Sequence, residues 1–419
     1  MNINEILSGV DCKCGKRHTS SIEKVYIEKG AAARLGELCA DYSTVLVVAD
    51  ENTYGAGGEK VKAALSDKKI TEVIFDGKSV LIPDQRAIER VTENLSGIEM
   101  IIALGSGVIQ DLCKYVSHFN KIPYIDVATA PSMDGYASVG AALILGGMKV
   151  TLNARVPEAI IADTSVLAKA PMDMIIAGYG DIIGKYSCLS DWRLAALVRG
   201  EYICDYVVRS TYEVVDGVRK AIDGIKKRDS AAIGKLMAAL VAVGILMAYV
   251  GNSRPASGSE HHLSHFFEII GIERDEAYLP HGTDVFYSSA LTARIRDELL
   301  RYERVPKPDE FSIEKYENDI KRIYGSLADE VIALQRKVGF YEQRDKRLSV
   351  YREKWQEIKA ILSDAPRYAE VEEMLREAGL NYSDFKKLYG EDKLKEAQLY
   401  GKDLKDRYTV LWTCFDIFS

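Results

Sequence analysis

Four of the six histidines in this 419-residue chain lie close together, at His261, His262, His265 and His281. If residues 260–269 form a helix, His261 and His265 lie one turn apart on one face, and His262 is rotated about 100° away from it. His281 follows a short predicted loop and could fold back toward that face. Two imidazoles on a helix and one on a returning loop suit a transition metal. The alternative is a polar helix end whose histidines bind nothing.

A metal site would need a further donor, and a carboxylate suits a divalent metal with open positions. Asp181 is the best candidate because it follows the glycine-rich stretch Gly178-Tyr-Gly180, where we expect the entrance to a helical region. Asp181 could equally well be the N-cap of a helix. The sequence leaves both interpretations open.

A second group of residues suits phosphate binding. The predicted strand 100–104 runs into Gly105-Ser-Gly107, and a predicted helix with Asp111 in its first turns follows. Glycines let the backbone approach a pyrophosphate, and the amides of a helix N-terminus favour an anion. The third glycine of the usual dinucleotide fingerprint is absent, so a plain tight turn is the alternative.

Two more polar features follow predicted strands. Asp50 ends the apolar run 45–50 and could accept a hydrogen bond from a ribose hydroxyl, although a turn or capping role is the alternative. The loop 129–138 follows the strand 124–128. In an open parallel sheet, ligands collect at the carboxyl ends of the strands. The three features together predict a dinucleotide site.

Cys12, Cys14 and His18 resemble a metal knuckle. A second Cys/His pair that would complete four ligands is missing nearby, so we favour a structured N-terminal loop over a metal site.

The elements that must position these residues divide the chain in two. Up to about residue 165, short β-rich runs alternate with helical ones, which predicts an α/β, Rossmann-like domain. Its expected strands are 25–27, 45–50, 72–75, 100–104, 124–128 and 159–162, with a hairpin over 137–152 that turns at Gly146-Gly147. Helical periodicity dominates afterwards, with helices expected at 172–190, 194–227, 230–250, 259–270, 282–301, 309–337, 350–362, 366–378 and 382–400. We therefore predict an NAD(P)-binding α/β domain over 1–165 and an all-helical metal- and substrate-binding domain over 166–419.

Composition sets the class of protein. A hydrophobic content of 47% and a charged content of 28% indicate a globular fold. A net charge of −7 argues against nucleic acid as a partner. The apolar run 236–250 is shorter than the roughly 20 residues that span a bilayer, so we expect a buried core helix. The start resembles no signal peptide, and seven scattered cysteines fit a reducing compartment, so we expect a cytoplasmic protein without a membrane partner.

Several motifs, in this order, resemble the sn-glycerol-1-phosphate dehydrogenases, and their bacterial branch in particular. This family belongs to the iron-containing alcohol dehydrogenase and dehydroquinate synthase-like superfamily. The resemblance covers most of residues 20–300 and is carried by Gly105-Ser-Gly-Val-Ile-Gln-Asp111, Thr129-Ala-Pro-Ser-Met-Asp-Gly135, Gly180-Asp181, Ser253-Arg-Pro-Ala-Ser-Gly-Ser-Glu-His261 and His281-Gly282. It implies a dehydroquinate synthase-like fold. Residues beyond about 305 match no functional element.

The resemblance also implies roles for single residues. Asp181, His261 and His281 correspond to the metal ligands, with zinc or nickel as the metal and iron as an alternative. Asp134 corresponds to a position beside the substrate hydroxyls, and His265 to a second histidine near the substrate. The residues that correspond to the coenzyme site are Asp50, Gly105, Ser106, Gly107, Asp111, Thr129 and Ser132, to which we add the neighbouring Ser138.

The activity implied is the interconversion of dihydroxyacetone phosphate and sn-glycerol 1-phosphate with NAD or NADP. Asp50 favours NAD, because a 2′-phosphate there would meet a carboxylate. The substrate phosphate needs a cation, for which we choose Arg254 with Ser253 and Ser257 beside it, an ion pair of Arg254 being the alternative. Lys149 is expected at the nicotinamide side of the substrate site.

Three other functions remain open. They are a glycerol or alcohol dehydrogenase of the same superfamily, a dehydroquinate synthase-type lyase, and a catalytically silent nucleotide-binding module. We expect a homodimer or a higher homo-oligomer.

Overall fold

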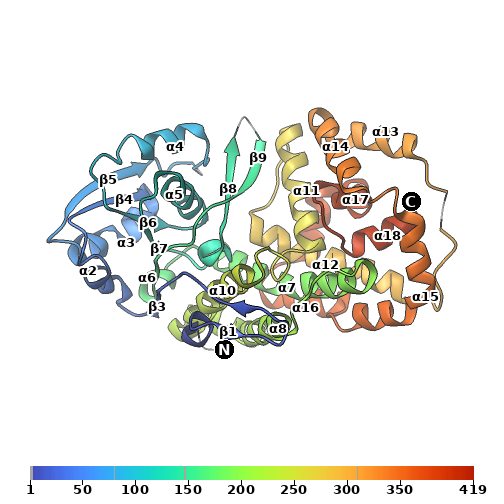
Figure 1. Cartoon of the computed structure of the whole chain (residues 1–419), viewed down its shortest axis with the longest axis horizontal. Helices are drawn as coiled ribbons and strands as arrows, with labels where there is room; N and C mark the ends of the chain where they lie inside the picture. The colour runs from blue at the N-terminus through green and yellow to red at the C-terminus, as the bar shows by residue number, and fades with distance from the viewer. Residues whose placement is uncertain (1–2, 80, 146–147, 309) are drawn as a thin grey trace. The chain divides into compact units, whose positions relative to one another are not determined.

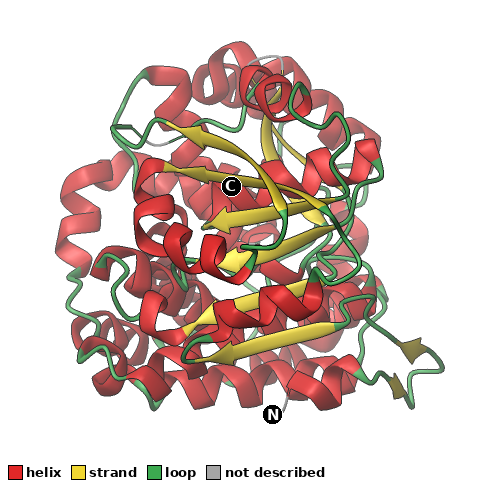
Figure 2. Ribbon diagram, turned by 90° about the vertical axis from the view of Figure 1, so that its left-hand side faces the viewer, coloured by secondary structure: helices red, strands yellow, loops and turns green. Residues whose placement is uncertain are grey.

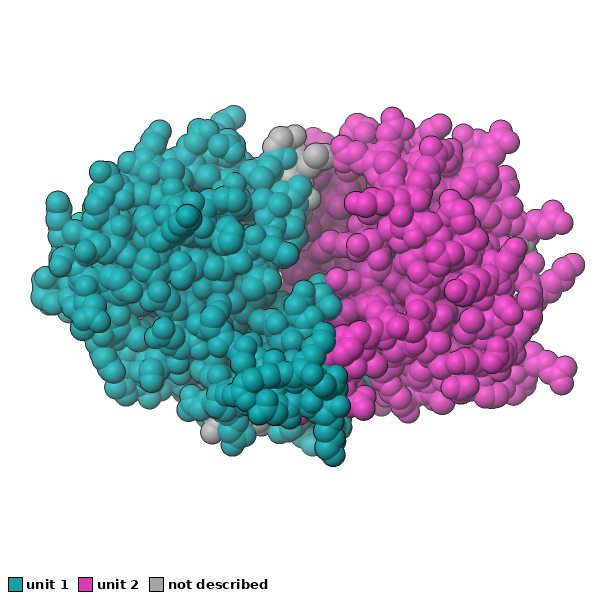
Figure 3. Space-filling model, in the orientation of Figure 1, with its two compact units in different colours: residues 1–182, 209–253 teal, residues 183–208, 254–419 magenta. Residues whose placement is uncertain are grey.

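The computed structural model describes residues 3–79, 81–145, 148–308 and 310–419. By its contacts the chain divides into two compact units. Unit 1 comprises residues 1–182 and 209–253, and unit 2 comprises residues 183–208 and 254–419, coloured separately in Figure 3. Helix α7 (Met172–Arg199) and helix α8 (Asp205–Arg219) each begin in one unit and end in the other.

Unit 1 is built on a six-stranded parallel sheet in the order β3-β10-β7-β6-β4-β5 (Figure 2). The strands are β3 (Lys24–Glu28), β4 (Thr44–Asp50), β5 (Lys69–Phe75), β6 (Met100–Gly105), β7 (Tyr124–Ala128) and β10 (Ala159–Asp163). The strand order reverses between β4 and β6, which makes this pair the switch point of the sheet. The predicted fold class is confirmed. The predicted domain division at residue 165 stays a prediction, since residues 166–182 and 209–253 also belong to unit 1 by their contacts.

Helices cover both faces of the sheet. Successive side chains of a strand point to opposite faces, and apolar side chains on both faces need to be buried. Val45 and Val47 of β4 pack toward η1 (Ala31–Arg34), α2 (Leu35–Leu38) and α3 (Glu51–Ala64). Leu46 and Val48 pack toward α4 (Gln85–Thr92) and α5 (Gly107–Asn120). The predicted hairpin is confirmed as β8 (Gly140–Leu145) and β9 (Met148–Asn153), while its expected turn at Gly146-Gly147 lies outside the described residues.

Helices and a small hairpin complete unit 1 (Figure 1). They are α1 (Ile3–Leu7), β1 (Val10–Asp11), β2 (Arg17–His18), η2 (Gly135–Ala137), α6 (Thr164–Leu167), α9 (Ile222–Lys226) and α10 (Ser230–Val250). By length and composition α10 could cross a membrane, but 67% of its most apolar window is buried. It packs against β3, α6 and η2, as expected for a core helix.

Helices also form unit 2, where the structure differs from the prediction at several ends. Its elements are α11 (Ser259–Arg274), α12 (His281–Leu300), α13 (Ile313–Tyr324), η3 (Gly325–Leu327), α14 (Ala328–Val338), α15 (Arg344–Ser363), α16 (Tyr368–Glu377), α17 (Tyr382–Tyr400), η4 (Gly401–Leu404) and α18 (Val410–Phe418). The expected single helix over 194–227 is wrong, because Gly200 adopts a left-handed conformation (φ 68°) that ends α7. Helix α18 was not expected.

The strand that carries the second polar loop, β7, also holds a buried carboxyl group. Asp126 is fully buried, and neither of its carboxylate oxygens has a hydrogen-bond partner among the described residues. Burial, together with the nearby Asp111, raises the pKa of Asp126 well above its usual range, against the opposing effect of Lys114. The folded protein therefore keeps a proton that the unfolded chain releases above pH ~3.9.

We expect Asp126→Val to raise the free energy of unfolding by about 1–3 kcal/mol at pH 7, because it removes an unsatisfied buried group without changing side-chain volume much. The native protein should lose stability as the pH rises above about 4, since its unfolded state then binds fewer protons than its folded state. Burial also raises the pKa of Asp284, so the variant should lose only the Asp126 contribution to this slope in urea unfolding measured across pH. Asp126→Asn is the control and should lose the same contribution with a smaller gain in stability. A less stable Val variant would mean that Asp126 has a partner.

Candidate functional site

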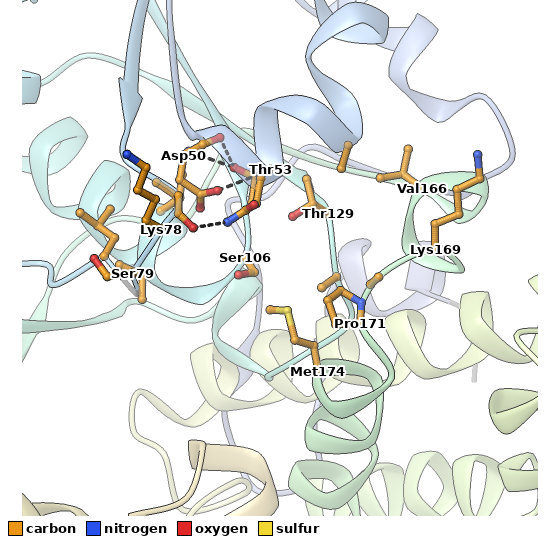
Figure 4. Close-up of a pocket in the computed structure, with 18 of the residues that line it drawn as sticks. Asp50, Thr53, Lys78, Ser79, Ser106, Thr129, Val166, Lys169, Pro171 and Met174 are labelled. Atoms are coloured by element: carbon orange, nitrogen blue, oxygen red, sulfur yellow. Dashed lines mark hydrogen bonds between the residues drawn. The ribbon is translucent and has the colours of Figure 1, made fainter.

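Unit 1 contains a cavity of about 720 Å³ at the carboxyl ends of β4 and β6 (Figure 4). This is the switch point of the sheet, where open α/β sheets bind their ligands, and the volume suits a large organic ligand. Three of the predicted coenzyme residues line it, namely Asp50, Ser106 and Thr129. Residues from three separate loops, each after a strand, thus lie at one cavity.

Asp50 has the capping role that the sequence left open, and it also lines the cavity. Its Oδ1 accepts from the Thr53 amide at 2.8 Å, and the Thr53 hydroxyl accepts from the Asp50 amide at 3.0 Å, which forms a capping box at the start of α3. The same side chain lies at the cavity wall (Figure 4). Helix α3 begins at Glu51 and runs through Tyr54-Gly-Ala-Gly-Gly58, although these glycines weaken the helical pattern of the sequence.

The Gly105–Gly107 turn is shaped by close packing. A Cβ at Gly105 would lie 2.6 Å from Cβ of Ile109, so any larger residue would displace the first turn of α5. The side chain of Gln110 donates to the carbonyl oxygens of Ala103 and Gly105, at 3.2 and 3.1 Å. These contacts leave Ser106 as the N-cap of α5 at the cavity wall, without a side-chain capping bond.

The other predicted coenzyme residues support this loop region. Asp111 accepts from the buried Lys114 ammonium at 3.0 Å and from the Ala142 amide at 3.1 Å, so it ties α5 to β8. Ser138 donates to the Gly135 carbonyl at 3.1 Å. Ser132 lies beside Tyr136, whose hydroxyl donates to the Ala130 carbonyl at 2.5 Å.

Several polar residues of the cavity were not predicted, namely Asn52, Lys60, Lys78, Ser79, Ser165 and Lys169. Lys60 pairs with Asp163 at 2.6 Å and contacts the Ser165 hydroxyl at 2.8 Å. Lys78 and Ser79 lie on the Asp50 side of the cavity in Figure 4. They follow β5, the strand next to β4, and this position after a parallel strand was the signal that could have identified them.

Asp181 does not cap a helix, because α7 begins at Met172 and Asp181 lies well inside it. It is buried, and its Oδ2 accepts from the backbone amide of Asp134 at 3.0 Å. A Cβ at Gly178, one turn earlier, would lie 1.8 Å from the Pro131 carbonyl oxygen. Close packing of α7 on the 129–135 loop thus brings the Asp181 carboxylate and Asp134 together within unit 1.

In unit 2 three of the four clustered histidines converge. The ring centroid of His261 lies 6.2 Å from that of His265 and 5.2 Å from that of His281, and the last two are 5.6 Å apart. His262 lies on another side of α11 and is fully buried. The expected loop before His281 is shorter than predicted, because α11 runs on to Arg274 and His281 is the first residue of α12.

The surroundings of His261 favour a neutral imidazole. Burial lowers its pKa well below the usual range, with Lys185 and the neighbouring histidines adding to the effect. Its Nδ1 lies 2.7 Å from Glu260 Oε1, so Nε2 is the nitrogen suited to a ligand. Burial and the nearby Asp191 raise the pKa of Glu260 to about 8.

Residues beyond 305 help to position these histidines, although no motif in that segment indicated such a role. Tyr389 of α17 stacks on Phe267 of α11, with ring centroids 4.1 Å apart. The Tyr389 hydroxyl donates to the Asp284 carboxyl at 2.6 Å and accepts from the Leu279 amide at 3.2 Å. One side chain therefore links α11, the loop before His281 and the first turn of α12.

The predicted phosphate residues have other contacts. Arg254 is buried and forms a bidentate ion pair with Glu201, its Nε lying 2.6 Å from Oε1, and its Nη1 donates to the Tyr408 carbonyl at 2.8 Å. The structure thus contains the ion pair that the sequence analysis left open as the alternative. Ser253 and Ser257 are half-buried in the segment between α10 and α11. Lys149 belongs to β9, and its side chain lies outside the described part of the chain.

We expect Arg254→Ala to lower the free energy of unfolding by about 2–3 kcal/mol, because it removes charge-assisted hydrogen bonds and leaves Glu201 unpaired. Glu201→Gln should also destabilise the protein, since Arg254 then stays buried without its counter-ion. Urea unfolding measures both effects. A phosphate-binding role would instead raise KM for a phosphorylated substrate in Arg254→Ala but not in Glu201→Gln.

Comparisons with known proteins agree with this geometry. Residues 26–171 match the family model for iron-containing alcohol dehydrogenases. The glycerol-1-phosphate dehydrogenase of Bacillus licheniformis, named as NAD(P)+-dependent, is 30% identical over 98% of this chain and 94% of its own. Its namesake from Geobacillus stearothermophilus is 36% identical over 67% of this chain and 71% of its own. The solved sulfoacetaldehyde reductase of Bifidobacterium kashiwanohense with NAD+ matches 95% of this chain and 97% of its own at a TM-score of 0.60 and 14% identity, and so shares the fold.

Proposed function

Since this chain belongs to the glycerol-1-phosphate dehydrogenases of the iron-containing alcohol dehydrogenase superfamily, we propose that it interconverts dihydroxyacetone phosphate and sn-glycerol 1-phosphate by hydride transfer with NAD(P)H. The observation that carries the proposal is the 30% identity to the Bacillus licheniformis enzyme over nearly the whole of both chains. The cavity at the switch point of the sheet supports it, because that is where this kind of sheet binds a dinucleotide.

The coenzyme occupies the unit 1 cavity in this proposal. Its pyrophosphate lies at Ser106 and the amides that begin α5, flanked by Gly105 and Gly107, and Asp111 holds that loop against β8. Asp50 accepts from the adenosine ribose, which favours NAD. Thr129, Ser132 and Ser138 belong to the nicotinamide side.

The donor set fits a divalent metal with open positions. Asp181 supplies a buried carboxylate, and His261 and His281 supply imidazoles whose rings lie 5.2 Å apart. Glu260 orients the His261 ring through Nδ1, as second partners of metal-bound histidines commonly do. Zinc, nickel or iron bound there would polarise the C2 oxygen of the ketone as a Lewis acid.

The remaining residues handle the proton and the phosphate. His265 lies 5.6 Å from His281 by ring centroids and can deliver a proton to the C2 oxygen as the hydride arrives. Asp134 is the other candidate for this proton transfer. Its backbone amide donates to the Asp181 carboxylate. Arg254, Ser253, Ser257 and Lys149 remain the proposed substrate residues, with Arg254 also bound to Glu201.

One assay tests the function. The purified protein is incubated with zinc or nickel, NADH and dihydroxyacetone phosphate, while absorbance loss and product chirality are followed. We expect NADH oxidation that yields sn-glycerol 1-phosphate. No oxidation, or equal turnover of unphosphorylated dihydroxyacetone, would contradict the proposal and favour another dehydrogenase of the superfamily. We also propose that the protein works as a homo-oligomer in the cytoplasm, which sedimentation and cell fractionation can test.

A further inference from the structure

The N-terminal hairpin gathers metal-binding side chains that the proposed reaction does not use. The thiols of Cys12 and Cys14 and a ring nitrogen of His18 all lie within 4.8 Å of one another. Strands β1 and β2 join through a tight turn in which the Cys12 amide donates to the Lys16 carbonyl and the Gly15 amide donates to the Cys12 carbonyl, both at 3.0 Å. Gly15 adopts φ 85°, which glycine takes without strain.

His18 is held in the tautomer that a metal requires. It is buried, and its ring stacks on Tyr249 of α10 with centroids 5.1 Å apart and planes 7° apart. Its Nδ1 lies 2.9 Å from the Tyr249 carbonyl oxygen. A carbonyl only accepts, so Nδ1 carries the hydrogen, and Nε2 is the nitrogen that faces Cys14. Such a carbonyl contact is a common second partner of a metal-bound histidine.

The distance between the donor atoms also suits a metal. Sγ of Cys14 lies 3.4 Å from Nε2 of His18. Two ligands of a tetrahedral zinc, at Zn–S of about 2.3 Å and Zn–N of about 2.0–2.1 Å, are ~3.6 Å apart. The hairpin itself has only two residue pairs, which is too few to be stable alone. A bound ion would therefore fix it against α10.

We propose that Cys12, Cys14 and His18 bind a structural zinc ion, separate from the metal of the proposed reaction, with another side chain as fourth ligand. Thiolates and imidazoles are the usual donors of structural zinc, whose four ligands all come from the protein. The ion would join the turn of the hairpin, which holds both cysteines, to the α10 contact made by His18 of β2. This revises the sequence interpretation, which favoured a plain loop because no second pair follows nearby.

Zinc content and cobalt substitution test the proposal on the full-length protein. We expect cobalt-substituted protein to show sulfur-to-cobalt charge-transfer absorption, because the ligands Asp181, His261 and His281 contain no sulfur. Cys14→Ser should lose this absorption and one zinc per chain, and its melting temperature should fall. Cys39→Ser, which changes a buried thiol in the sheet core, is the matched control and should keep both. His261→Ala should keep the absorption, because His261 belongs to the metal site of the proposed reaction and not to the zinc site. A failure of the proposed function can therefore be told apart from a failure of the zinc proposal.

If Cys14→Ser does not fold, X-ray absorption at the zinc edge of the native protein decides the question. Two sulfur neighbours at a zinc distance would support the site. The proposal is overturned if the native protein shows no sulfur ligand, or if a folded Cys14→Ser protein keeps the same zinc content and absorption.

Discussion

The His261→Ala protein is expected to lose its metal and to reduce dihydroxyacetone phosphate at least about 10³-fold less efficiently, since Lewis-acid stabilisation is worth several kcal/mol. NADH binding should be unchanged, because His261 is not among the residues that line the cavity we assign to the coenzyme. Metal analysis, kcat/KM and NADH fluorescence titration measure the three effects.

His262→Leu is the matched control for His261→Ala, because it changes the adjacent residue of the same helix. Both ring nitrogens of His262 are buried and lack a hydrogen-bond partner among the residues that the structure describes. An apolar replacement should therefore keep both metal and activity. Equal losses in the two variants would indicate damage to α11 and not removal of a ligand. The kcat/KM of His265→Ala should lie between those of His261→Ala and His262→Leu, since general acid catalysis contributes about 10²–10⁴-fold to the rate.

Gly178→Ala should lower the free energy of unfolding by at least about 3 kcal/mol, beyond most overpacking substitutions. The added Cβ would lie 1.8 Å from the backbone oxygen of Pro131, which cannot rotate away as a side chain could. The 129–135 loop must move, and with it Thr129 at the cavity wall and the Asp134 amide that binds Asp181. NADH affinity should therefore fall together with stability, as unfolding and fluorescence titration will show.

Gly55→Ala is the control for this substitution. Gly55 lies in the exposed part of α3, where an added Cβ meets nothing within 4 Å. Alanine should stabilise the helix there by about 0.5–1 kcal/mol. A tolerated Gly178→Ala would mean that α7 and the 129–135 loop are less tightly packed than the structure indicates.

The sequence by itself determined the alternation of strands and helices, because buried strands such as 45–50 and 100–104 are short apolar runs that end in an acid or are followed by glycine. It also indicated that the polar loops after these strands lie close together, since parallel strands present their carboxyl ends at one edge. Helical periodicity placed His261 and His265 on one face. These are local patterns, which can be recognised without knowledge of the tertiary contacts.

Only the tertiary structure decided what distant residues do. Arg254 forms an ion pair with Glu201. Tyr389, from a segment without a recognisable motif, contacts the helices that carry the histidines. Asp181 lies inside a helix that begins before the glycines that precede it in the sequence. The ligand atoms of Cys12, Cys14 and His18 converge because Tyr249, more than 200 residues later, holds the His18 ring. Such pairings depend on which surfaces pack together, and spacing along the chain does not encode them.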